Sequence, residues 1–247
     1  TALASSWTYA DLKFSVTWDP AIFSGPFSGR VVVYLSSRSK EAREAPNWFN
    51  PEPMYSAKFK SVRAGAAMVI AESNAVGYPG RLSTLKAGDY WVQAVVDRNL
   101  GGRTIGYSPG NLVSEPVRLH LDLADAKAVD LRCTRVNVEG PFKDTKYCRE
   151  ASVASKLLSK WYGRPTRIRG AVCLPDAYFA EPTRRFPVLY VVPGFGGNHR
   201  SFSGRTSAAQ PVGDEPFIRV VLDPDCPTGH SVFADSDNNG PWGLALT

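Results

Sequence analysis

The hydrophobic pattern of this chain changes near residue 125, and that change constrains the fold more than any other feature. From Leu12 to about Leu123, short segments alternate apolar and polar residues or are rich in β-branched residues, and Gly, Pro, Asn and Asp separate them. After residue 125 the apolar segments become longer, continuous runs. We therefore predict two domains, residues 1–125 and residues 126–247.

The pattern of the first domain predicts an all-β fold. Phe14, Val16 and Trp18 alternate with polar residues, as in a strand with one buried face. Further strands are predicted at 31–35, 68–71, 90–96 and 117–121. Short strands at this spacing, without helical periodicity, favour a β-sandwich of immunoglobulin-like architecture.

A proline-rich segment, residues 46–53, interrupts the first domain and carries Trp48 and Phe49. Two interpretations remain open. The two rings could fill the edge of the sandwich or the seam between the domains, as large aromatic side chains commonly do. Alternatively, they could form a platform on which a sugar stacks.

The second domain has the pattern of an α/β fold. Apolar residues at helical spacing within 152–162 predict a short helix that ends near Gly163, and a strand is predicted at 166–174. The apolar runs 186–192 and 217–222 are typical of strands buried on both faces of a mainly parallel sheet. Two such strands, separated by a connection of this length, predict a β-α-β unit.

A glycine-rich loop follows the first of these apolar runs. Gly194, Gly196 and Gly197 come directly after the strand and so lie at the carboxyl end of the predicted sheet. Open α/β sheets bind their ligands at that edge. Main-chain N–H groups that no side chain shields could hold an oxyanion there, although a glycine turn needed only for tight packing would look the same.

Four segments from about Tyr162 onward form a recognisable pattern: Gly163-Arg164-Pro165, 172–175 (Val-Cys-Leu-Pro), the strand with its glycine loop, and 221–225 (Val-Leu-Asp-Pro-Asp). In these segments the sequence resembles the family of enterochelin esterase-like and esterase D-like α/β-hydrolases. Many members carry an N-terminal β-sandwich. The resemblance implies a carboxylic ester hydrolase with a small-molecule or polysaccharide-linked ester as substrate, and this chain would be its N-terminal portion.

The resemblance also implies roles for individual residues. The family loop usually reads His-Gly-x-Gly, and one of its amides stabilises the tetrahedral intermediate. Here Pro193 replaces the histidine, so the oxyanion role passes to the backbone of Phe195 or Gly196. Gly194, Gly197 and His199 are then expected beside the substrate, and Ser231 at the mouth of the site.

The serine, acid and histidine of a catalytic triad are expected outside these 247 residues. No G-x-S-x-G motif is present; the nearest match is 229–233 (Gly-His-Ser-Val-Phe), and no histidine follows His230. By itself the chain is therefore expected to lack triad-based esterase activity. A C-terminal half of the same hydrolase would be its partner. Two alternatives remain: a non-catalytic carbohydrate-binding β-sandwich module, or one fragment of a hydrolase assembled from two pieces.

No metal or cofactor is expected. The segment 235–240 resembles the start of a calcium-binding EF-hand loop, but Leu246 stands where the loop needs a glutamate. The four cysteines lack the C-x-x-C spacing of a zinc site. Cys133 and Cys148 could form a disulfide in an exported protein, and Cys173 is expected to be buried.

Charge and hydropathy bear on partners and location. The formal charge is +6, but the basic residues are scattered and no RNA- or DNA-binding motif accompanies them, so no nucleic-acid partner is expected. No apolar stretch is long enough to span a bilayer, and no membrane association is expected. The Ala2-Leu3-Ala4 pattern resembles the remnant of a cleaved signal peptide and favours a secreted or periplasmic location.

Overall fold

The computed structural model describes residues 12–46, 49, 51–125 and 127–247. It contains two compact units that divide between Val138 and Glu139. Strands make up 39% of the described residues and helices 12%, so the described part of the protein is mostly β. Among the described residues, no helix is long and apolar enough to cross a membrane.

The first unit is built around one curled sheet, for which the described residues supply nine strands. The strands are β1 (Lys13–Trp18), β2 (Phe27–Ser36), β3 (Met54–Val62), β4 (Met68–Ile70), β5 (Val76–Tyr78), β6 (Gly88–Asp97), β7 (Leu112–Ser114), β8 (Val117–Leu121) and β9 (Ala128–Val136). Short 3-10 turns lie at Ala42–Glu44, Leu82–Thr84 and Leu123–Asp125.

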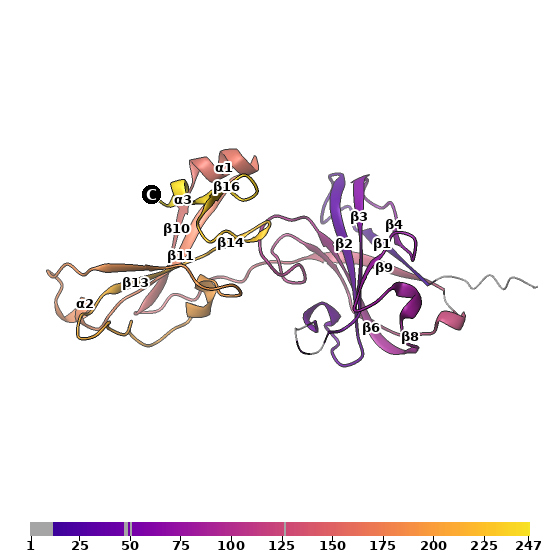
Figure 1. Ribbon diagram of the computed structural model, residues 1–247, viewed down its shortest axis with the longest axis horizontal. Helices are drawn as coiled ribbons and strands as arrows, with labels where there is room; N and C mark the ends of the chain where they lie inside the picture. The colour runs from indigo at the N-terminus through magenta and orange to yellow at the C-terminus, as the bar shows by residue number, and fades with distance from the viewer. Residues whose placement is uncertain (1–11, 47–48, 50, 126) are drawn as a thin grey trace, which may run out of the picture. The chain divides into compact units, whose positions relative to one another are not determined.

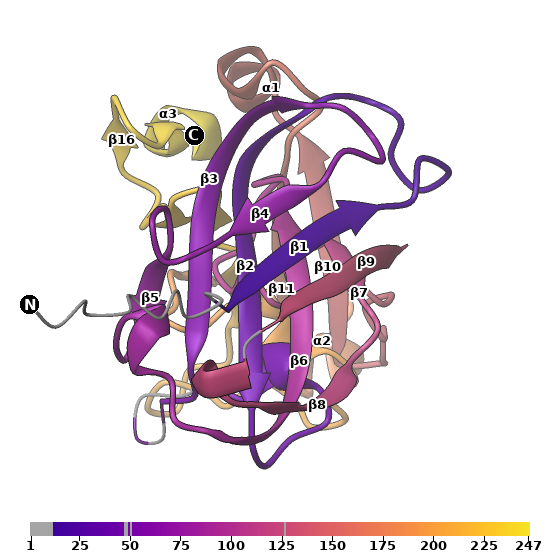
Figure 2. The ribbon, with the colours of Figure 1, turned by 90° about the vertical axis from the view of Figure 1, so that its right-hand side faces the viewer.

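The strand order is β4-β1-β9-β7-β6-β2-β3-β5, and β8 also pairs with β6. β1 and β9 run parallel, whereas the other neighbours are antiparallel. In Figure 2, β1, β4 and β9 lie in front of β2, β3 and β6, so the curled sheet folds over itself. The main core lies between these two parts of the sheet.

The alternating pattern of the first strand is confirmed. Phe14, Val16 and Trp18 are buried, whereas the residues between them are at least partly exposed. The predicted strands at 31–35, 68–71, 90–96 and 117–121 also correspond to strands of the sheet. β2 is buried on both faces because Val32 and Tyr34 pack in a second cluster with Ala42.

The boundary between the units lies later than residue 125, where the sequence pattern placed it. β9 belongs to the first sheet, in which it pairs with β1 from Lys13↔Ala128 to Trp18↔Cys133 and with β7. A strand joins its sheet through partners far away in the chain. The local change of hydrophobic pattern therefore did not reveal where the sheet ends.

The second unit contains a four-stranded mixed sheet of order β10-β11-β13-β12. Its strands are β10 (Cys148–Ala154), β11 (Arg167–Cys173), β12 (Val188–Val191) and β13 (Ile218–Leu222). β10 and β11, and β11 and β13, are antiparallel; β12 and β13 are parallel. Two small hairpins follow, β14 (Asp225–Cys226) with β15 (Gly229–His230) and β16 (Asp235–Ser236) with β17 (Gly240–Pro241).

The helices of this unit are α1 (Lys156–Tyr162), α2 (Ala177–Ala180) and α3 (Trp242–Leu246), with a 3-10 turn at His199–Phe202. α1 begins after Ser155, whose hydroxyl accepts a hydrogen bond from the Leu158 N–H, and it ends at Gly163 with φ +63°. The helix predicted within 152–162 is therefore shorter, because its first residues belong to β10. α1 and α3 lie side by side in Figure 1, with buried Leu158 and Trp242 in one cluster.

The two apolar runs of this unit pair in parallel, but the prediction that both are buried on both faces was wrong for β12. β12 is the last strand of the sheet, and the exposed fractions of Leu189 and Tyr190 are 41% and 62%. No described residue pairs with its outer edge. The connection to β13 contains the 3-10 turn at His199–Phe202 and no α-helix, so no described helix of that connection covers the strand.

The Cys133–Cys148 disulfide left open by the sequence is absent from the structure. All four cysteines are free. Cys133 is buried in the core of the first unit and Cys148 in a core cluster of the second, beside Cys173. Cys173 is buried as predicted.

Candidate functional site

The glycine-rich loop leaves the carboxyl end of β12 in a tight turn. The Gly197 N–H donates to the Gly194 carbonyl oxygen at 2.9 Å, and Gly196 has φ +101°, a conformation that disfavours a side chain. A Cβ atom built on Gly194 or Gly196 would meet no atom within 4 Å. The Phe195 side chain is 76% exposed. The outer side of this loop is therefore open space into which a ligand could approach the main chain.

A second loop, after the neighbouring strand β13, lies against the glycine loop. Nε2 of His230 is 3.0 Å from the carbonyl oxygen of Pro193, and the Val232 N–H donates to Nδ1 at 3.1 Å. Because Nδ1 accepts, Nε2 carries the proton and donates to Pro193. The His230 ring also contacts the Phe195 ring, with centroids 6.4 Å apart. Both loops follow the carboxyl ends of parallel strands, where α/β proteins place ligands.

Asn198 and Asp225 form a further link between the two loops. The Asn198 side-chain amide donates to Asp225 Oδ2 at 3.1 Å, and its Oδ1 caps the 3-10 turn by accepting from the Arg200 N–H. The Asp225 N–H donates in turn to Asp223 Oδ1. These contacts fix the end of the glycine loop to the start of the β13 loop.

Ser231 is buried and supports a strained turn. Its Oγ accepts from the Phe233 N–H at 3.3 Å, and its own N–H donates to the Pro224 oxygen at 2.8 Å. Val232 and Phe233 follow with φ of 49° and 52°, which L-residues with bulky side chains rarely adopt. Phe233 is held by edge-on packing against Trp242. Ser231, expected at the mouth of the site, therefore has its hydroxyl in the interior.

His199, which the sequence placed beside the substrate, is also enclosed. Its side chain has no exposed surface. Nε2 lies 2.9 Å from Glu150 Oε1, Nδ1 lies 3.5 Å from Asp223 Oδ2, and the ring stacks on Phe142 at 5.8 Å. This histidine anchors the segment after the glycine loop to the sheet. It does not face the open side of the loop.

Asp223 is the centre of a charged network beneath the two loops. Its Oδ2 accepts from Nε of Arg169 at 2.9 Å, and Arg169 also pairs with Glu139. Burial alone would raise the pKa of the Asp223 carboxyl, but the adjacent His199 ring and the charge of Arg169 hold it below its usual range. Asp223 is therefore an anion whose partners fix the end of β13.

The acidic segment 235–240 forms the hairpin of β16 and β17; α3 follows it, but the element before it is the strand β15 and not the first helix of an EF-hand. Asp235 Oδ1 accepts from the Leu244 N–H at 3.1 Å near the start of α3, and Asn239 bonds to Thr228. Within the described ranges, no three His, Cys, Asp or Glu side chains gather as a metal site would require.

The open side of the glycine loop could admit a ligand close to the main chain, but the described residues of the two loops assemble no nucleophile and base. Both nitrogens of His230 are engaged with main-chain atoms, and the Ser231 hydroxyl accepts from a backbone N–H. The structure brings Gly194, Phe195 and Gly196 together with His230, whereas His199 and Ser231 lie inside. The sequence pattern did not predict a role in the site for Asn198, Asp223 and Asp225. The signal that could have revealed them is that they are polar residues in the segments that follow the two predicted strands.

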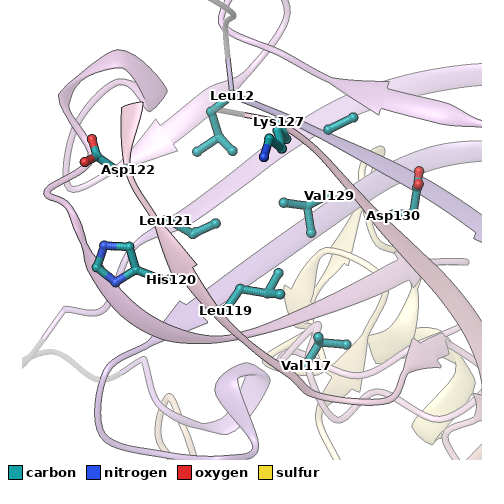
Figure 3. A pocket seen from close by; sticks show the side chains of 10 residues that line it. Leu12, Val117, Leu119, His120, Leu121, Asp122, Lys127, Val129 and Asp130 are labelled. Carbon is teal, nitrogen blue, oxygen red and sulfur yellow. The ribbon is translucent and has the colours of Figure 1, made fainter. Parts of the chain in front are cut away.

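The first unit contains a hollow of about 340 Å³ between β8 and β9. Figure 3 shows Val117, Leu119 and Val129 pointing into it, with His120 and Asp122 at its border. His120 is exposed, and its Nδ1 lies 2.9 Å from Asp89 Oδ1. Phe49 is 92% exposed and does not fill an edge of the sheet; Trp48 lies outside the described residues.

No family model matches the chain, and no curated protein matches it.

Proposed function

We propose that this chain is the N-terminal portion of a serine esterase of the α/β-hydrolase class, in which the glycine loop supplies the oxyanion hole. The single observation that carries the proposal is the position of that loop. It leaves the carboxyl end of β12, lies against the loop that follows the parallel strand β13, and has open space over Gly194 and Gly196. Ligand sites of α/β sheets occupy this position.

In the proposed reaction, a serine attacks the carbonyl carbon of an ester and negative charge develops on the carbonyl oxygen. A main-chain N–H of Phe195 or Gly196 would donate to that oxygen, a contribution worth about 10²-fold or more in rate for a single donor. His230 would act as a positioning residue because it holds the Pro193 carbonyl, immediately before the loop. The nucleophile and general base would come from residues outside this chain.

The fold of the complete enzyme belongs to the same proposal. A strand order of β10-β11-β13-β12, with antiparallel pairs followed by a parallel pair, is compatible with the beginning of an α/β-hydrolase sheet. The exposed apolar strand β12 would then be the edge at which further parallel strands add. The first unit would be an accessory β-sandwich of immunoglobulin-like type, and the protein would be secreted or periplasmic.

The test is labelling by a fluorophosphonate, which reacts with activated serines. We expect the 247-residue chain to remain unlabelled, and a longer product of the same gene that contains it to be labelled. In that product, Gly196→Val should lower the labelling rate about 10²-fold, since the side chain fills the open side of the loop. Gly213→Val is the matched control, because Gly213 is also a positive-φ glycine with open space around it, outside the glycine loop.

Two outcomes would contradict the proposal. Labelling of the 247-residue chain that disappears in Ser231→Ala would make Ser231 the nucleophile. Failure of every longer product to react would remove the esterase class altogether.

The second candidate is a non-catalytic carbohydrate-binding module in the first unit. The observation that favours it is the almost fully exposed ring of Phe49, since exposed aromatic faces can stack on sugars. The hollow between β8 and β9 is a weaker sugar site, because its lining contains aliphatic side chains and no Phe, Tyr or Trp. Retention on polysaccharide columns that is lost in Phe49→Ala, with folding unchanged, would support this candidate; equal elution of both proteins would exclude it.

A further inference from the structure

Two of the four free cysteines face each other in the second unit. Cys148 is the first residue of β10 and Cys173 the last of β11, and the antiparallel register places them directly opposite each other. Both are buried, in a cluster that includes Ala209. The other two cysteines, Cys133 and Cys226, belong to different clusters.

The backbone hydrogen bonds define the geometry of this pair. The Leu174 N–H donates to the Tyr147 oxygen at 2.8 Å, so the neighbouring pair Tyr147–Leu174 is hydrogen-bonded. The Cys148 N–H donates instead to Thr145 Oγ1. Because the two kinds of pair alternate along antiparallel strands, Cys148 and Cys173 occupy a non-hydrogen-bonded position.

Such a position suits a disulfide. Directly opposed residues at a non-hydrogen-bonded position have Cα atoms about 4.5 Å apart, with their side chains closer than at the alternate position. Disulfides span Cα separations from about 4.4 Å. The backbone therefore needs no rearrangement for the two sulfur atoms to meet.

We propose that Cys148 and Cys173 are a redox-active pair that oxidises to a cross-strand disulfide. The inference concerns this pair alone and does not depend on the esterase proposal. In an oxidising compartment the disulfide would be the prevalent form, and under reducing conditions the dithiol.

The surroundings of the pair assign the order of events. The hydrogen bond from the Cys148 thiol lowers the pKa of Cys173, burial opposes this, and the charges of Arg205 and Arg219 assist it. The same hydrogen bond raises the pKa of Cys148. Arg219 is also the residue directly opposite Cys173 in the neighbouring strand β13, and this nearby cation assigns Cys173 as the thiol that attacks the oxidant.

With glutathione disulfide as oxidant, the reaction balances in two exchanges. The Cys173 thiolate attacks one sulfur of glutathione disulfide, a mixed disulfide forms, and one glutathione leaves. Cys148 then attacks the sulfur of Cys173, the cross-strand bond forms, and the second glutathione leaves. Both protein thiol protons end on the two released glutathiones, which are reduced as the protein pair is oxidised.

The disulfide would affect the segment that follows the glycine loop. Phe202, at the end of the 3-10 turn, packs against the cysteine cluster, and the Ala209 N–H donates to the Leu174 oxygen at 2.9 Å. The disulfide would close residues 148–173 into a covalent loop, which would stabilise β10, α1 and β11 by restricting this segment in the unfolded chain. β10 is the other terminal strand of the sheet among the described residues, so local opening of that edge gives the oxidant access.

The experiment compares the wild-type chain with Cys148→Ala and with Cys226→Ala as the matched control for a buried cysteine. Each protein is refolded in excess glutathione disulfide, unfolded in an alkylating reagent, and analysed by intact mass and peptide mapping. A second sample is oxidised without unfolding, and its thermal midpoint is recorded with and without dithiothreitol.

We expect wild type and Cys226→Ala each to lose two alkylatable thiols, with one crosslinked peptide that joins Cys148 to Cys173. Their thermal midpoints should rise by several degrees on oxidation, and that of Cys148→Ala should not change. Full alkylation of both cysteines after refolding would overturn the proposal. Stable glutathione adducts or a disulfide to Cys133 or Cys226 would also overturn it.

Discussion

The imidazole of His230 joins two loops of the second unit by donating from Nε2 to the carbonyl oxygen of Pro193, 3.0 Å away. The same ring accepts the Val232 N–H at Nδ1. One side chain thus holds both its own turn and the start of the glycine loop. The position of the glycine loop therefore depends on His230, a residue of the loop that follows β13.

We predict that His230→Ala loosens the glycine loop. Two hydrogen bonds are lost, each worth about 1 kcal/mol, so hydrogen exchange in residues 193–198 and at Val232 should accelerate. Limited proteolysis should cleave the loop sooner than in wild type. His120→Ala is the control, since His120 is exposed and pairs only across the surface of the first unit; an equal effect of both substitutions would contradict the prediction.

Asp223→Asn should destabilise the second unit by about 3 kcal/mol. The change removes the anion that pairs with the partly buried Arg169 and lies beside the enclosed His199. Native-state hydrogen exchange of β11 and β13 would measure the loss of free energy of unfolding. Asp89→Asn, which breaks only exposed pairs with Arg118 and His120, should leave these values unchanged.

The same carboxyl predicts the direction of acid unfolding. Because the pKa of Asp223 is lowered in the folded state, the unfolded chain binds the proton more readily. The free energy of unfolding therefore increases with pH between the folded and the unfolded pKa of this carboxyl. The contribution is complete above the unfolded pKa of about 4 and is lost as the pH falls through the folded value. Asp223→Asn should therefore flatten the acid limb of the stability profile of the second unit, whereas an unchanged slope would assign that limb to other groups.

The strands were the most predictable part of the fold because their apolar residues repeat along the chain itself. Phe14, Val16 and Trp18 show which face is buried without reference to any partner. β9 and β12 were less predictable. Whether Val129 joins the first sheet depends on its partner strand β1, which is distant in the sequence, and the exposure of Tyr190 follows from the place of β12 at the end of its sheet.

The candidate site shows the same limit. The position of the glycine loop followed from one strand and three glycines, which are local features. The burial of His199 did not, because it depends on Glu150 and Asp223, two residues that are remote in the sequence. The strained φ of Val232 has no signal in the sequence, since valine is disfavoured in that conformation.

We predict that Val232→Gly is neutral or stabilising by up to about 1 kcal/mol. Valine loses about 1–2 kcal/mol in a left-handed conformation, and 59% of the Val232 side chain is exposed, so little packing is lost with it. Glycine adopts positive φ without this strain, but it loses more backbone entropy on folding, so only part of the strain energy is recovered. Val153→Gly, in strand β10 with 67% exposure, should instead destabilise. Thermal and urea unfolding of both variants test the contrast, and equal losses would show that the turn is not strained.

Tyr190→Lys should reduce self-association of this chain. β12 presents an edge with no described partner strand, and Val188, Leu189 and Tyr190 are exposed along it. Such an edge pairs with other chains, and a lysine on it discourages pairing through charge. Light scattering as a function of concentration should show less association for Tyr190→Lys than for Val153→Lys on β10, with equal thermal midpoints. If Val153→Lys suppresses association as strongly, the contact does not run through β12.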